Sequence, residues 1–127
     1  MTWVQHDGSA ASIYVNLYDG VDWGTETTIE SGSGDAYYPK IASNNTGYCV
    51  SWVQNDGTIN SAFANTFDGS TWGTEQALES SNTEVNRDWE KLINVVATQD
   101  TYTISWLQED SNDSLIDNAW AYSGLSD

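Results

Sequence analysis

The 127-residue chain has the length of one domain and carries 19 acidic but only 3 basic residues, a formal net charge of −16. Binding to nucleic-acid phosphates or to an anionic membrane surface is therefore not expected, because few cations are available to neutralise either. Seven Trp, seven Tyr and two Phe favour packed sheets over a disordered chain. The single cysteine, Cys49, excludes an intrachain disulfide and is expected in the core.

The chain repeats itself with an offset of 49 residues. Residues 1–32 are identical to residues 50–81 at 15 of 32 positions without a gap. A weaker third copy begins at Trp106. A repeat near 50 residues that consists of short strands is typical of a β-propeller blade or a similar β-array.

Period-two alternation and turn residues predict short strands in three units, at residues 1–31, 38–80 and 89–122. The first unit lacks a first strand, the second is a complete four-stranded meander, and the third lacks a fourth strand. The predicted strands, in chain order, are 2–5, 12–18 and 23–30, then 40–43, 48–54, 61–67 and 72–79, then 90–96, 102–108 and 116–122. Turns are predicted at 44–47, 55–58 and 68–71.

The third copy is looser than the other two. Its alignment predicts three additional residues between its first strand and Trp106, and about three more within residues 111–115. We therefore predict a single all-β domain over residues 1–127. It is made of antiparallel four-stranded meander repeats of β-propeller-blade type, about two and a half repeats with three, four and three strands.

The predicted strands are apolar on both faces, which indicates a neighbouring sheet on each side. In the strand at 48–54, Val50 and Trp52 lie on one face and Cys49 and Val53 on the other. Units with uncovered faces need caps or partners. We therefore predict a homo-oligomer, with a two-fold dimer of six blade-like units favoured.

Two recurring segments carry a resemblance to a known group of proteins. They read Trp-Val-Gln-x-Asp-Gly at 3–8 and 52–57, and Asp-Gly-x-x-Trp-Gly at 19–24 and 68–73. With the aromatic strand between them, they resemble the repeats of bacterial sialidase-like and fucose-lectin-like β-propellers. This resemblance covers nearly the whole chain and implies a fold, and an extracellular or cell-surface location, rather than an activity.

Residues 66–72 also look like a shortened Asp-box, which is a turn device in which a carboxylate caps a hairpin and an aromatic plugs the sheet. Correspondingly, Asp7, Asp19, Asp56 and Asp68 are expected to hold their turns by accepting hydrogen bonds from local backbone amides.

Catalysis is not expected. Sialidase chemistry needs an arginine cluster to clamp the substrate carboxylate, and the chain has only Arg87. No feature of the sequence picks out a carboxylate pair for another glycosidase. The only histidine, His6, corresponds to Asn55 and Glu109 in the other copies, as a solvent-facing turn residue would.

The function predicted is a noncatalytic binding module for carbohydrate. Propeller lectins bind sugars between blades, beside a tryptophan, although the arginine of the fucose-lectin site has no equivalent in any copy. The candidate ligand residues are Trp52, Gln54 and Asn65 at recurring positions, and Arg87 and Trp89 where the pattern breaks. The alternative is a structural or protein-interaction element without a small-molecule ligand, in which the recurring tryptophans are core.

No cofactor is predicted, with calcium as the one alternative. The densest acidic stretch, at 109–114, offers Asp110, Asn112 and Asp113 as oxygen ligands. Its spacing departs from the calcium loops of helix–loop–helix proteins, and it lacks their glycine.

Overall fold

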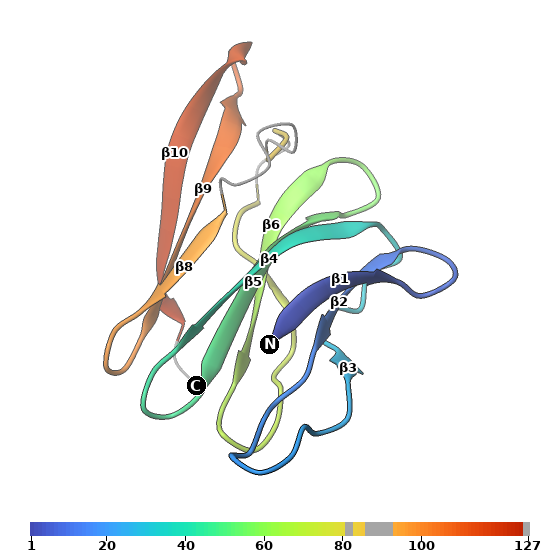
Figure 1. Ribbon diagram of the computed structural model, residues 1–127. Coiled ribbons are helices and arrows are strands. Elements are labelled where there is room, and N and C mark those ends of the chain that lie inside the picture. The colour runs from blue at the N-terminus through green and yellow to red at the C-terminus, as the bar shows by residue number, and fades with distance from the viewer. Residues whose placement is uncertain (81–82, 86–92, 126–127) are drawn as a thin grey trace.

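The computed structural model describes residues 1–80, 83–85 and 93–125, without the side chains of 113–117 and 125. These residues form three antiparallel sheets of three, four and three strands (Figure 1), so the all-β fold class is confirmed. Among the described residues, no helix is long and apolar enough to cross a membrane.

The strands follow one another along the chain within each sheet. Sheet 1 contains β1 (Thr2–His6), β2 (Ala11–Val15) and β3 (Thr27–Thr28). Sheet 2 contains β4 (Ala36–Ser43), β5 (Tyr48–Asn55), β6 (Asn60–Phe67) and β7 (Gln76–Ala77). Sheet 3 contains β8 (Asn94–Ala97), β9 (Tyr102–Asp110) and β10 (Asp113–Leu125).

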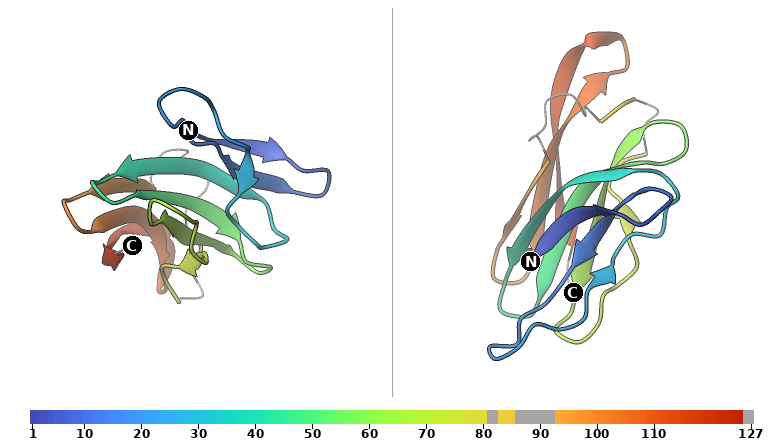
Figure 2. Two further views of the ribbon diagram at one scale, coloured as in Figure 1. Left: turned by 90° about the horizontal axis from the view of Figure 1, so that it is seen from below. Right: turned by 45° about the vertical axis from the view of Figure 1, so that its right-hand side comes forward.

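Sheet 2 lies between the other two sheets (Figure 2) and is buried on both faces. Successive side chains of a strand point to opposite faces. Val50 and Trp52 therefore pack with Ile13 and Val15 of sheet 1. On the other face, side chains of β5 and β6 pack with sheet 3, and the buried residues of this second cluster include Cys49, Val53, Ala62, Ala64, Ile104 and Trp106. A neighbouring sheet on each side thus explains why the strands of sheet 2 are apolar on both faces, as predicted.

Carboxylates hold the turns as predicted. Asp56 Oδ1 accepts hydrogen bonds from the backbone amides of Thr58 at 2.9 Å and Ile59 at 3.0 Å, and Gly57 follows it with φ 104°. These amides, with Ile59 first, and the Thr58 and Ser61 hydroxyls lower the pKa of Asp56 to about 2. The carboxylates of Asp7, Asp19 and Asp68 accept equivalent amide bonds.

The first strand of sheet 2 differs from its predicted bounds. β4 begins at Ala36 rather than at residue 40, and it continues past Pro39 through a register shift between Tyr37 and Lys40. Tyr38 takes the unusual φ of 57° within this shift and packs against the cluster between sheets 2 and 3.

The outer strands are also shorter than predicted, since β3 and β7 contain two residues each. At β3 the preceding loop takes the place of the longer strand. The amide of Gly24 donates to Leu17 O at 2.8 Å, and Asn16 Nδ2 donates to Gly24 O at 3.0 Å. These bonds use the backbone groups that a longer β3 would have paired with β2.

The predicted position of one insertion in the third copy was wrong. The turn between β8 and β9 closes through Thr98 N and Thr101 O at 2.8 Å, with the same length as the turn after Ser43. The additional residues instead lie between Val85, which pairs with Gln108, and Asn94. The apolar residues just before Asn94 had suggested that the strand started earlier. The insertion within 111–115 is confirmed, because Asn118 pairs with Gln108 as Ser61 pairs with Gln54.

Candidate functional site

Two of the predicted ligand residues, Trp52 and Gln54, lie in the interior. Trp52 is 0% exposed and Gln54 is 1% exposed. Trp52 Nε1 donates to Gln54 Oε1 at 2.9 Å. Gln54 Nε2 donates to the connection between β3 and β4, to Glu30 Oε2 at 3.2 Å and to Gly34 O at 3.3 Å. We call this arrangement the Trp–Gln–Glu link. It joins sheet 2 to the segment that leaves sheet 1.

A second Trp–Gln–Glu link joins sheet 3 to sheet 2. Trp106 Nε1 donates to Gln108 Oε1 at 3.1 Å, and Gln108 Nε2 donates to Glu79 Oε2 at 3.3 Å and to Thr83 O at 2.9 Å. In sheet 1 the corresponding bond, from Trp3 Nε1 to Gln5 Oε1 at 3.1 Å, is exposed. The recurring Trp-x-Gln spacing is therefore a device for joining neighbouring sheets. It places both side chains on the same face of one strand.

Asn65 also uses its side-chain amide for hydrogen bonds within the protein. Its Nδ2 donates to Ile29 O at 3.0 Å and to Gly73 O at 3.1 Å. It lines a cavity of about 300 Å³ with Glu30 and Glu75. Glu75 accepts there from the amide and the hydroxyl of Ser31, at 2.9 and 2.6 Å, whereas Asn65 Oδ1 is buried and has no hydrogen-bond partner among the described residues. The remaining predicted ligand residues, Arg87 and Trp89, lie outside the described residues.

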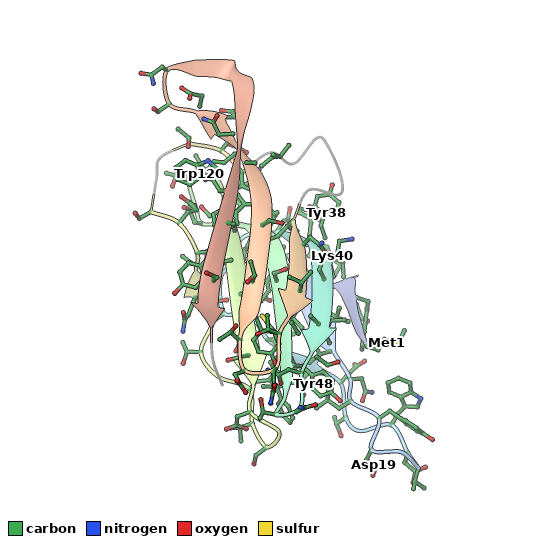
Figure 3. All side chains as sticks on the ribbon, turned by 90° about the vertical axis from the view of Figure 1, so that its left-hand side faces the viewer. Met1, Asp19, Tyr38, Lys40, Tyr48 and Trp120 are labelled. Atoms are coloured by element: carbon green, nitrogen blue, oxygen red, sulfur yellow. The ribbon has the colours of Figure 1, made fainter. Side chains whose placement is uncertain are left out.

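A larger cleft of about 600 Å³ lies where the loop between β2 and β3 approaches the turn between β4 and β5. Asp19 and Tyr48 mark this end of the molecule in Figure 3, and Trp120 lies toward the other end. The cleft brings together residues of sheets 1 and 2 that are far apart in the sequence. Its lining includes Tyr18, Asp19, Asp22, Trp23, Asn44, Asn45, Thr46, Tyr48 and Phe67.

One wall of the cleft is an exposed aromatic pair. Tyr18 and Trp23 form an isolated bridge that closes the loop, and their ring centroids lie 5.3 Å apart. Between them, Asp19 Oδ1 accepts from the amides of Asp22 at 2.9 Å and Val21 at 2.8 Å, which lowers the pKa of this carboxyl. Tyr18 is 51% exposed and Trp23 is 55% exposed. The loop thus holds two large aromatic surfaces in contact with solvent.

The opposite wall is a polar turn. Asn44 Oδ1 accepts from the amides of Thr46 at 2.9 Å and Gly47 at 2.8 Å. Its Nδ2 is buried and has no hydrogen-bond partner among the described residues. Gly69, with φ 90°, completes this wall; a Cβ there would lie 3.0 Å from Thr46 O. Glycine therefore permits the β6–β7 loop to approach the turn.

The chemistry of the cleft is that of a binding site with flat apolar surfaces and neutral or negative polar groups. Asp19 and Asp22 disfavour an anionic ligand, whereas the side chain of Asn45 offers hydrogen bonds to hydroxyl groups. Among the described residues, no group of three or more His, Cys, Asp or Glu side chains is placed to hold a metal ion.

The structure describes the side chains of only some of the predicted calcium ligands. Asp110 Oδ1 accepts from the amide of Asn112 at 2.7 Å, and Asp110 Oδ2 accepts from Asn118 Nδ2 at 2.8 Å. Asp110 therefore holds the β9–β10 turn in the way that Asp56 holds the β5–β6 turn. The side chain of Asp113 lies outside the described part of the chain. Calcium binding at this turn stays a prediction.

The sequence analysis chose Trp52 and not Trp23 as a ligand residue, although both tryptophans recur with the repeat. Trp72, the counterpart of Trp23, is half-buried and packs against the cluster between sheets 1 and 2. The Asp, Gly and Trp positions of the Asp-Gly-x-x-Trp-Gly segment are identical in the two copies. The one available signal was the change from Phe67 to Tyr18, which is a more polar ring suited to an exposed site.

Comparisons with known proteins do not assign the chain to a family. No family model matches the chain, and no match was found among curated proteins or among solved structures. The resemblance to propeller repeats accordingly stays a prediction based on the recurring segments.

Proposed function

We propose that the protein is a noncatalytic carbohydrate-binding module built from propeller-blade-like sheets, and that the cleft between sheets 1 and 2 is its binding site. The observation that carries this proposal is the half-exposed Tyr18–Trp23 pair, which faces the polar turn at residues 44–47 across a cleft of about 600 Å³. Small-molecule sites have volumes of roughly 300–1,000 Å³ and combine aromatic walls with a few polar groups.

A sugar ring has apolar C–H faces and a rim of hydroxyl groups. Its C–H face fits the flat surfaces of Tyr18 and Trp23, and each Å² of apolar surface removed from water contributes roughly 25 cal/mol. The hydroxyl groups can bond to Asn45 and Asp22, which have both donors and acceptors between them.

Charge selects among carbohydrates. Asp19 and Asp22 line the cleft, and the chain has a formal net charge of −16. A carboxylated or sulfated glycan would meet repulsion from both sources. We therefore propose that the ligands are neutral glycans, which also distinguishes this site from one for sialic acid.

A structural or protein-interaction element is the second candidate. The burial of Trp52 and Trp106 in Trp–Gln–Glu links supports it, because this is where core tryptophans of a repeat array belong. The two candidates differ in the role of Trp23, whose half-exposed ring would only close its loop under the second one.

A glycan array probed at high protein loading tests the proposal. The variants are Trp23→Ala in the cleft and Trp120→Ala, a matched control because Trp120 is 50% exposed and lies away from the cleft. We expect the wild-type chain and Trp120→Ala to bind the same neutral glycans, and Trp23→Ala to bind them at least tenfold more weakly. An array without hits, or equal binding by Trp23→Ala, would overturn the proposal.

A further inference from the structure

The outward face of sheet 1 has the composition of an interface. Ile13 and Val15 point toward sheet 2, so Tyr14 and its register partner Trp3 lie on the opposite face. The two rings stack with centroids 5.9 Å apart and an interplanar angle of 22°, and both remain half-buried.

The same pair occurs in sheet 2, where it is covered. Trp52 and Phe63 are register partners, stack with centroids 6.2 Å apart at 15°, and pack against sheet 1. Trp52 is completely buried there. The outward face of sheet 1 therefore carries the type of residues that, in sheet 2, receive a neighbouring sheet.

The outward face of sheet 3 has the complementary composition. Ile104 and Trp106 point toward sheet 2, so the residues between and beside them point away. The register gives the outward face four central residues: Ser105, Leu107, Ala119 and Ala121. In sheet 2 the corresponding residues, on the face toward sheet 3, are Ser51, Val53, Ala62 and Ala64. Three of the four are identical, and Leu107 replaces Val53.

Neither outward face has a charged side chain at its centre, although 19 of the 127 residues are acidic. The nearest acid on the β9 row is Glu109, whose amide donates to Glu84 O at 3.0 Å. Acidic residues are thus placed at the ends of these faces, as at a surface that receives a partner.

We propose that the occupant of both faces is a second copy of this chain. The outer face of sheet 3 in one copy packs on the outward face of sheet 1 in the other, with Ala119 and Ala121 against Trp3 and Tyr14. This contact continues the two sheet–sheet interfaces that the chain already contains. Each copy carries one face of each kind, so a reciprocal second contact closes a two-fold dimer.

The structure also indicates how this interface differs from those within the chain. The described part of sheet 3 has no counterpart of β3 or β7, the strands that precede Glu30 and Glu79 in the Trp–Gln–Glu links. Two copies of charge −16 repel each other, so association strengthens with added salt.

Light scattering across a concentration series in 0.5 M NaCl tests the proposal. We expect a limiting mass of twice the 14.0 kDa chain. Two variants each place a carboxylate on one face, Trp3→Glu on sheet 1 and Ala121→Glu on sheet 3. Val21→Glu adds the same charge at a loop position that is 78% exposed and on neither face, and it should associate as the wild type does.

Mixing the two variants separates this arrangement from others. Each variant alone should stay at 14.0 kDa, and an equimolar mixture should double in mass, because Ala121→Glu retains the sheet 1 face and Trp3→Glu retains the sheet 3 face. Recovery in the mixture also shows that both variants fold; Tyr14→Glu replaces Trp3→Glu if its circular dichroism spectrum is not native. A wild-type chain that remains at 14.0 kDa at every concentration overturns the proposal, as does either variant that doubles by itself.

Discussion

Replacement of Gln54 by leucine removes the central group of one Trp–Gln–Glu link while nearly conserving side-chain volume. Trp52 Nε1 then loses its acceptor inside the core, since Trp52 is 0% exposed. A buried donor without a partner costs about 1–3 kcal/mol. Glu30 and Gly34 O are only partly buried, so water replaces part of their lost bonds. We expect Gln54→Leu to lower the free energy of unfolding by about 2–4 kcal/mol.

The chain supplies its own control. Gln5 makes the same bond to Trp3, at 3.1 Å, but in an exposed position. Water replaces the lost acceptor there, so Gln5→Leu should cost less than about 0.5 kcal/mol. Gln108→Leu, in the second link, should resemble Gln54→Leu because Gln108 is also 1% exposed.

Urea unfolding followed by circular dichroism measures all three variants. The measurement uses the Ala121→Glu background, so that self-association does not stabilise the chain. If Gln5→Leu destabilises the chain as much as Gln54→Leu, the bond within the strand accounts for the effect, and the link between sheets does not.

Two further predictions concern a turn and a close approach. The lowered pKa of Asp56, about 2, means that its carboxylate stabilises the fold above about pH 4 and that this contribution disappears as the pH falls toward 2. Asp56→Ala should therefore be destabilising at pH 7 but nearly neutral at pH 2, as measured by urea midpoints; an equal loss at both pH values would contradict this role. Gly34→Ala should unfold the chain or cost at least about 3 kcal/mol, because a Cβ at this position would overlap the backbone oxygen of Asn55. A native circular dichroism spectrum with an unchanged midpoint for Gly34→Ala would refute this packing.

The repeat made most of the fold predictable. The offset of 49 residues transfers strands and turns from one copy to the next, and Asp-Gly positions mark the hairpins through hydrogen bonds that are local in sequence. The start of β4 was not predictable in the same way. Its register shift at Tyr38 depends on packing against sheet 3, which no local pattern describes.

The candidate site was harder to predict than the fold. Trp52 and Trp23 both recur, and their exposure depends on which sheet lies across from each of them. The Trp-x-Gln spacing does indicate that the two side chains lie on the same face of a strand, within reach of a hydrogen bond. Only the structure shows that Glu30, in the segment after β3, accepts a hydrogen bond from Gln54.

The indole N–H signals test the division between structural and ligand-binding tryptophans. The chain has seven tryptophans, so a ¹H–¹⁵N spectrum resolves their side chains individually after assignment. Titration with a neutral glycan identified on the array should shift the Trp23 signal and leave those of Trp52 and Trp106 unchanged and protected from exchange. Saturating glycan that leaves the Trp23 signal unchanged, or that shifts the Trp52 signal, would contradict this division.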